Sequence, residues 1–341
     1  MSGLTEPLIS IITPVYNGGP YLRECIESVQ AQTYPNWRYT IVNNCSSDDT
    51  AAIAATYAAR DPRIRISHNQ SFLPLVANHS HALTLIEPQA QFVKPLMADD
   101  WLYPECLTEL AACARAHPAV GLVCTRALTA QEQLLFDRLP PSTDAVTLLS
   151  GHAAGRMALL EDRYFFGSPT TMLLRADLVR ARTPFYNPDN PQADEEACYD
   201  ILRGCDFAFV HQTLAYVRVH ARSHTSAINS LCSIPSCRTY ALAAYGRDYL
   251  SEAEFSALLA RRMREYYARL AQGVIEGRDA RFWEFHRRLL RMIGQPLDRL
   301  RLARAVAVLV ARKFASPLKL ARGLAARAQA RRAGDTDAGK S

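Results

Sequence analysis

Two adjacent carboxylates follow an apolar run at 94–97 and are the first residues whose types suggest chemistry. Asp99 and Asp100 stand between that run and Trp101. Carboxylates suit hard cations that also bind diphosphate oxygens. The pair is therefore either a metal site or turn chemistry between a strand and a helix. The predicted next helix already starts with Pro104, so the pair is poorly placed as its cap.

A second acidic group, Asp194, Glu195 and Glu196, opens a predicted helix at 193–205. Acids in the first turn of a helix are favourable for dipole reasons alone. Capping therefore remains one interpretation of this cluster.

A basic group ends the stretch YVRVHARSHT at 216–225. Arg218 could neutralise phosphate, and His220 could bind a metal or donate to phosphate. The alternative for His220 is a purely structural role.

Three polar loops, at 13–19, 43–49 and 98–101, follow predicted apolar strands. In open α/β sheets, ligands bind outside the carboxyl ends of the strands. The chain contains neither a G-x-G-x-x-G fingerprint nor a P-loop. Phosphate must be bound in another way, and a divalent metal held by a carboxylate is the obvious one.

The elements that would position these loops alternate between strand and helix, which indicates βαβ units and a parallel sheet. The predicted strands are 8–17, 39–42, 63–67, 91–97 and 120–128, and the predicted helices are 21–32, 50–60 and 104–117. Residues 207–220 are typical of two short strands, and 129–165 is irregular. We expect an α/β domain over 1–235 and a helical, basic extension over 236–341 with a disordered end.

The distribution of charge and the spacing of the cysteines argue against two classes of protein, those that bind nucleic acid and those that bind zinc. The net charge is +6, yet 299–334 alone holds ten lysines and arginines and no acid, so the rest of the chain is net acidic. This argues against a nucleic-acid-binding core. Nine cysteines without a CxxC pair predict reduced thiols, no zinc site and a cytoplasmic protein.

The basic stretch 301–332 is amphipathic, and its apolar part is too short to span a bilayer. Such a helix can lie on an anionic membrane surface, here the inner face of the plasma membrane. The alternative is a helix packed on the catalytic domain with a solvated, arginine-rich face.

Four stretches in order, 10–50, 92–107, 167–175 and 193–225, resemble the inverting family 2 glycosyltransferases. That family has the GT-A fold, a Rossmann-like, mostly parallel sheet flanked by helices, and uses nucleotide-diphosphate sugars. The resemblance implies that several residues bind the nucleotide. These are Thr13, Pro14, Val15, Tyr16, Asn43, Asn44, Lys94 and Asp99.

The resemblance also implies a metal site. Asp99 falls on the second acid of the family's Asp-x-Asp motif and would bind Mn²⁺ or Mg²⁺, with Asp100 beside it and His220 completing the ligands. Met97 replaces the first acid of that motif. Asn43 and Asn44 stand where the family usually has Asp, and either could instead close an Asx-turn.

For the chemistry, the resemblance implies that Asp194 is the general base and Glu196 a second carboxylate. If the alignment with the family shifts by one residue, Glu195 becomes the general base instead. Arg218 would neutralise the leaving group. The loop containing Gly167 and Ser168 would face the acceptor.

The expected activity is a single displacement that moves a sugar, from a UDP-sugar above all, to a hydroxyl of a glycan or lipid-linked acceptor in cell-surface polysaccharide or glycolipid synthesis. One alternative is a sugar nucleotidyltransferase, although the loop at 13–19 lacks the expected basic residue. Another is a catalytically inactive binding or scaffold protein, suggested by Met97, Asn43, Asn44 and Ala193 where acids are usual.

Overall fold

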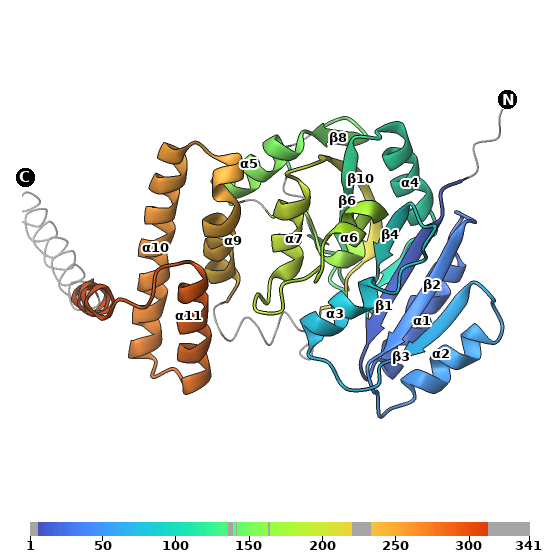
Figure 1. The fold of residues 1–341 in the computed structure, drawn as a ribbon, viewed down its shortest axis with the longest axis horizontal. Coiled ribbons are helices and arrows are strands. Elements are labelled where there is room, and N and C mark those ends of the chain that lie inside the picture. The colour runs from blue at the N-terminus through green and yellow to red at the C-terminus, as the bar shows by residue number, and fades with distance from the viewer. Residues whose placement is uncertain (1–5, 136–138, 141, 163, 220–232, 313–341) are drawn as a thin grey trace, which may run out of the picture. The chain divides into compact units, whose positions relative to one another are not determined.

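The computed structural model describes residues 6–312, apart from 136–138, 141, 163 and 220–232. These residues contain one ten-stranded sheet in the order β3-β2-β1-β4-β9-β6-β10-β5, with β7 beside β6 and β8 beside β10 (Figure 1). The strands are β1 Ile9–Val15, β2 Trp37–Asn43, β3 Ile64–His68, β4 Phe92–Pro95, β5 Trp101–Leu102, β6 Val120–Leu128, β7 Leu134–Leu135, β8 Val146–Leu149, β9 Met172–Arg175 and β10 Asp206–Tyr216. The helices are α1 Gly19–Gln30, α2 Thr50–Ala58, α3 Leu75–Leu83, α4 Cys106–Ala116, α5 Gly151–Glu161, α6 Ala176–Ala181, α7 Ala193–Ile201, α9 Ser233–Tyr249, α10 Glu252–Ile275 and α11 Ala280–Met292, with a 3₁₀ turn, η1, at Pro169–Thr171.

The amino-terminal half of the sheet is parallel. Strand β1 pairs in parallel with β2 and β4, and β2 pairs in parallel with β3. Strand β9 runs antiparallel to both β4 and β6, and β10 is again parallel to β6. The carboxyl ends of β1, β2 and β4 therefore meet at one edge of the sheet, which brings the loops after them together. The predicted α/β fold with helices flanking the sheet is confirmed.

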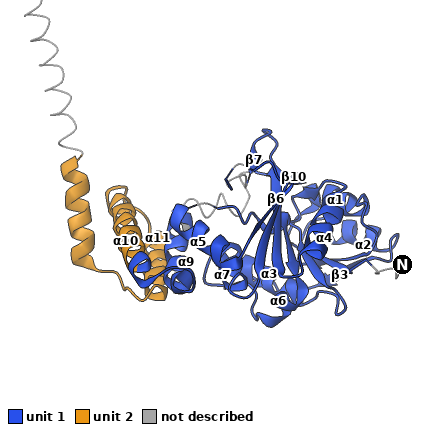
Figure 2. Cartoon of the chain, turned by 90° about the horizontal axis from the view of Figure 1, so that it is seen from above, with its two compact units in different colours: residues 1–255 blue, residues 256–341 orange. Residues whose placement is uncertain are grey.

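Helices α1, α2 and α4 cover one face of the sheet, and α3, α6 and α7 lie on the other (Figure 2). The first face holds the main apolar core, because α1 buries Leu22, Cys25, Ile26 and Val29 against it. These positions are the apolar stripe that the helical period predicts.

Three segments differ from the sequence-based expectation. Residues 207–220 were predicted as two strands, but β10 is one strand whose pairing with β6 shifts register between Val210 and Thr213. A β-bulge of this kind interrupts the alternation of apolar residues. The irregular stretch 129–165 contains α5, which Ser150 caps by accepting a hydrogen bond from the Ala153 amide (3.1 Å). Helix α3 was not predicted.

The chain divides into two compact units, residues 1–255 and residues 256 onward, coloured separately in Figure 2. Helix α9 belongs to the first unit, and α11 to the second. The expected boundary at 235/236 falls within the first turn of α9, whereas the first unit extends through Phe255. Across the part of the chain that the structure describes, every helix is too short or too polar to cross a bilayer.

Candidate functional site

The loops after β1 and β2 are joined by side-chain hydrogen bonds to backbone amides. Asn17 adopts a left-handed conformation (φ 51°), and its Oδ1 accepts from the Ser47 amide at 2.9 Å. The Asp48 carboxylate accepts from the Gly19 amide at 3.0 Å and from the Thr50 amide at 3.1 Å. Asp48 thus accepts from the first backbone amide of both α1 and α2, and these two bonds hold the loops after β1 and β2 side by side.

The four residues predicted to bind the nucleotide from the first loop have different surroundings. Thr13 and Val15 are buried toward the core, whereas Pro14 faces a pocket on the opposite side of the sheet. The Tyr16 side chain is 51% exposed and contacts the ring of Phe72 edge-on, with centroids 4.9 Å apart. Of these four residues, Tyr16 is the one whose side chain is exposed.

The two asparagines of the second loop use their amides on the protein itself. Asn44 Oδ1 accepts from the Asn69 side chain (2.8 Å) and the Leu73 amide (2.9 Å), and its Nδ2 donates to the Leu73 carbonyl (2.8 Å). Asn43 Oδ1 accepts from the Ser46 amide at 3.1 Å, as a turn requires. The Asn43 contact favours the turn interpretation, whereas Asn44 holds the segment before α3 and closes no turn.

Phe72 is a candidate ligand contact that the sequence analysis missed. Its side chain is 56% exposed. It precedes Leu73, whose backbone N–H donates to the Asn44 side chain and whose carbonyl accepts from it. The signal available in the sequence was an aromatic residue in the polar loop NQSFLP before α3.

The two aspartates after β4 have different environments. Asp100 is 4% exposed, and its carboxylate accepts from Thr170 Oγ1 (2.5 Å) and from the Arg218 amide (2.9 Å). Burial, together with the neighbouring Asp99 charge, raises the pKa of Asp100 to about 7. Asp99 is half-buried. Asp99 is therefore the better placed of the two for a ligand.

Arg218 holds this loop in place. Its Nε donates to the Asp99 carbonyl at 3.0 Å, and its guanidinium pairs with Glu24 at 2.5 Å. The guanidinium also lies 4.8 Å from the centroid of the Tyr21 ring. These contacts give Arg218 a structural role next to the predicted leaving-group site. His220 lies outside the described residues.

Lys94 was expected to contact the nucleotide, and the structure places it differently. Its side chain is 0% exposed inside the sheet. The ammonium donates to the carbonyls of Thr170 and Met172, the latter at 3.0 Å. Lys94 thus links β4 to the turn that holds Asp100, and its ammonium has no surface through which to reach a ligand.

The acidic cluster at the start of α7 divides into one half-buried and two buried side chains. Glu196 is 3% exposed and accepts from Asn190 Nδ2 (2.8 Å) and the Tyr245 hydroxyl (3.1 Å). Glu195 is 4% exposed, and burial raises its pKa to about 7. Asp194 is half-buried, and burial raises its pKa as well. Of the three acids, Asp194 has the surroundings that a base needs.

The predicted acceptor loop lies beside Asp194. The Tyr164 hydroxyl contacts the Gly167 carbonyl and lies 3.4 Å from Asp194 Oδ2. Gly167 has a positive φ of 86°, a conformation that favours glycine. The Ser168 hydroxyl is buried and makes no hydrogen bond within the described part of the chain.

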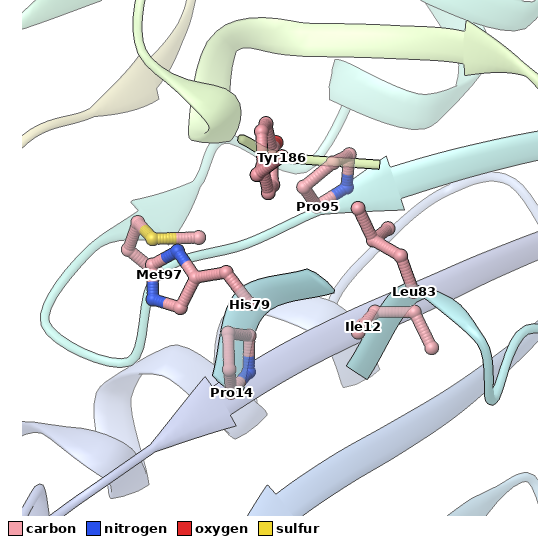
Figure 3. Close-up of a pocket in the computed structure, with 7 residues that line it drawn as sticks. All are labelled: Ile12, Pro14, His79, Leu83, Pro95, Met97 and Tyr186. Atoms are coloured by element: carbon pink, nitrogen blue, oxygen red, sulfur yellow. The ribbon is translucent and has the colours of Figure 1, made fainter. Parts of the chain in front are cut away.

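A small pocket lies between Met97, in the loop after β4, and Tyr186, in the segment between α6 and α7 (Figure 3). It is lined by Ile12, Pro14, His79, Leu83, Pro95, Met97 and Tyr186. Figure 3 shows the His79 imidazole, which the sequence analysis did not single out, beside Met97. Burial, and after it the charge of Asp194, raise the pKa of the Tyr186 phenol. Met97, two residues before Asp99, and Tyr186 therefore face the same space.

The donor set fits a hard cation that shares its ligands with a substrate. Among the described residues, no group of three or more His, Cys, Asp or Glu side chains could hold a metal by itself. Mg²⁺ and related ions are commonly bound through one or two carboxylates together with substrate phosphates. Asp99 can supply one such carboxylate, whereas Asp100 is already bonded to Thr170 and Arg218.

Parallel strands β1, β2 and β4 with polar loops at their carboxyl ends, a carboxylate after β4 and a second one at the start of α7 are typical of a GT-A glycosyltransferase. The sequence model of glycosyl transferase family 2 matches residues 10–182. The chain belongs to this family, and the resemblance stated from the motifs is confirmed.

Curated relatives match shorter segments. The uncharacterized protein y4gI of Sinorhizobium fredii is 34% identical over 121 residues, which cover 35% of this chain and 13% of that protein. The O-antigen biosynthesis protein RfbC of Myxococcus xanthus is 33% identical over 124 residues, covering 35% and 9%. The aligned segments thus make up only a small part of these relatives.

Solved structures resemble most of the chain. S. aureus TarS 1–349 in complex with UDP-GlcNAc has a TM-score of 0.61 and 17% identity, covering 88% of this chain and 87% of that one. The mannosyltransferase PcManGT from Pyrobaculum calidifontis, in complex with GDP-Man and Mn²⁺, has a TM-score of 0.55 and 15% identity, covering 89% and 87%. At these identities the likeness concerns the fold.

Proposed function

We propose that this protein is an inverting, metal-dependent glycosyltransferase that moves a sugar from a nucleotide-diphosphate sugar to an acceptor hydroxyl. The observation that carries the proposal is that Asp99 and Asp194 are each the half-buried member of an acidic group whose neighbouring acid is enclosed by hydrogen bonds or an ion pair, in a chain that belongs to glycosyl transferase family 2. A single displacement needs these two carboxylates on either side of one sugar.

In the proposed mechanism, Asp194 accepts the proton of the acceptor hydroxyl as its oxygen attacks the anomeric carbon. The nucleoside diphosphate leaves from the opposite face, so the configuration inverts. The raised pKa of Asp194 makes it a stronger base than an exposed aspartate. A Mn²⁺ or Mg²⁺ ion held by Asp99 would neutralise charge on the departing diphosphate.

We infer a UDP-sugar as the donor and the Tyr16–Phe72 pair as the apolar surface for its base. Both rings are more than half exposed. Aromatic side chains offer such a surface to any nucleobase. Support for the nucleotide comes from TarS, whose complex contains UDP-GlcNAc, although PcManGT holds GDP-Man.

For the acceptor, we propose a glycan or lipid-linked glycan in cell-surface polysaccharide synthesis, as the name of the relative RfbC suggests. Residues 299–312 form a further helix after α11, and its side chains support a peripheral position on the cytoplasmic face of the membrane. It carries four arginines and no acid, and Leu300 and Val308 are 73% and 54% exposed. An anionic membrane surface complements such a helix.

The test is release of nucleoside diphosphate from a panel of nucleotide sugars, with and without Mn²⁺. We expect metal-dependent turnover that Asp99→Ala lowers by about 10²-fold or more and that Asp194→Asn lowers by about 10²- to 10⁴-fold. Glu105→Gln is the matched control, because it removes an exposed carboxylate downstream of the same loop.

Donor binding without turnover across the whole panel would instead identify an inactive binding protein. Full activity of Asp194→Asn would place the base elsewhere, and metal-independent turnover would remove the role given to Asp99.

A further inference from the structure

Helix α9 begins about 50 residues beyond the segment that the family model matches, yet it contacts the acidic cluster of α7. Arg238, in the second turn of α9, lies 3.2 Å from Glu195 (Nε to Oε2) and 3.4 Å from Asp162 (Nη1 to Oδ1). Its guanidinium is 5.3 Å from the centroid of the Tyr164 ring. One side chain thus joins α9, α7 and the segment after α5.

The Arg238 contact favours the charged form of Glu195 and opposes the burial that raises its pKa. Glu195 is 4% exposed, and Arg238 is the cation paired with it. The Tyr199 hydroxyl is a weaker partner at 3.5 Å. A buried carboxylate that loses its cation must either take up a proton or move toward solvent. Because Glu195 follows Asp194 directly, movement of that turn would displace Asp194.

Arg238 also reaches Asp194 through Tyr164. A guanidinium over an aromatic ring limits the positions that the ring can adopt. The hydroxyl of that ring lies 3.4 Å from Asp194 Oδ2 and contacts the Gly167 carbonyl. Two separate contacts of Arg238, one with Glu195 and one with Tyr164, therefore fix the surroundings of Asp194.

We propose that Arg238 is a positioning residue for the candidate base Asp194, so that α9 is part of the catalytic apparatus and not of a separate extension. This inference rests on the proposed function. Glu196, the other buried acid, also has partners on α9, namely the hydroxyls of Tyr245 (3.1 Å) and Tyr240 (3.5 Å). Helix α9 thereby engages both buried acids of α7 and leaves Asp194 as the half-buried one.

The experiment compares kcat and donor KM of Arg238→Met, Arg238→Lys and Arg247→Met in the full chain. Arg247 is the matched control, since it lies on the same helix in a pair with Glu252 whose side chains are 63% and 67% exposed. We expect Arg238→Met to lower kcat by about 10²-fold, with donor KM changed less than about twofold, because misplacement of a reacting group affects the chemical step. Arg238→Lys keeps the charge and restores part of kcat.

A double-mutant cycle with Glu195→Gln covers the case in which Arg238→Met folds poorly. Glu195→Gln removes the buried charge, so the double variant should fold and have a kcat about tenfold above that of Arg238→Met. Rates are expressed per folded molecule, counted by nucleotide titration.

Equal kcat in Arg238→Met and the Arg247→Met control would overturn the inference, as would parallel changes in kcat and KM. Asp194→Asn is measured in the same series. If Asp194→Asn keeps full activity, the base assignment itself fails. If Asp194→Asn is inactive while Arg238→Met has normal kcat, only the positioning role of Arg238 is refuted, and the assignment of Asp194 as the base stands.

Discussion

Replacing Lys94 with methionine tests whether this lysine holds the sheet together or contacts a nucleotide. The side chain is 0% exposed, and its ammonium donates to the carbonyls of Thr170 and Met172. Methionine has a similar length and is apolar, so it can fill the space without either hydrogen bond.

The expected loss of stability follows from the two carbonyls. A buried acceptor that loses its donor costs about 1–3 kcal/mol, so two cost about 2–6 kcal/mol. Burial lowers the pKa of Lys94, which means that the ammonium itself is destabilised in this site. Removing that charge offsets part of the loss, and we expect the free energy of unfolding to fall by about 2–4 kcal/mol.

Urea unfolding at constant m measures this change as a midpoint lowered by about 1–2 M. Arg60→Met is the control, since Arg60 is an exposed cation at the end of α2 and its loss should change stability by less than about 0.5 kcal/mol. The affinity of the folded variant for nucleotide should stay within about twofold of the original. Unchanged stability together with lost nucleotide affinity would refute the structural role of Lys94.

Two further predictions concern alkaline stability and lipid binding. Burial raises the pKa of seven cysteine thiols, for example Cys25 to about 12 and Cys113 to about 11, so between about pH 8.5 and those values the unfolded chain loses thiol protons that the folded chain retains. The free energy of unfolding should therefore fall as pH rises above about 8.5, with a slope that approaches at most about 1.4 kcal/mol per pH unit for each buried thiol, and a flat chemical-denaturation profile from pH 8 to 10 would contradict this. The full chain should co-sediment with phosphatidylglycerol vesicles more than with phosphatidylcholine vesicles. Leu300→Asp with Val308→Asp should weaken the binding, and equal binding to both vesicle types would argue against the membrane role of 299–312.

The parallel half of the sheet could be predicted because its signals are local. The strand at Ile9–Val15 is a continuous apolar run, and α1 has one apolar face with the period of a helix. Helix α3 escaped prediction because its sequence, LVANHSHAL, mixes polar and apolar residues without a clear stripe. Its buried face includes Asn78 and Ser80, whose side chains are hydrogen-bonded to Asn69 and to the Tyr186 carbonyl. The spacing of apolar residues cannot indicate a buried face that is partly polar.

The residue types of the site could also be predicted from the loops at the strand ends, but the partners of each side chain could not. Asn44 bonds to Asn69 and Leu73, and Arg218 bonds to the backbone of Asp99, at sequence separations of 25 to 119 residues. A motif specifies which side chain stands at a position. Whether the side chain is available to a ligand depends on these distant partners.

Burial decides which member of each acidic group is available for chemistry. Asp99 and Asp100 are adjacent, yet Asp100 is enclosed by Thr170 and the Arg218 amide, while Asp99 is half-buried. Asp194 and Glu195 differ in the same way, because Glu195 is buried against Arg238. In both pairs the contacts of the enclosed acid hold the turn that carries its half-buried neighbour. A substitution of the enclosed acid should therefore disturb the geometry of the site before it disturbs ligand contacts.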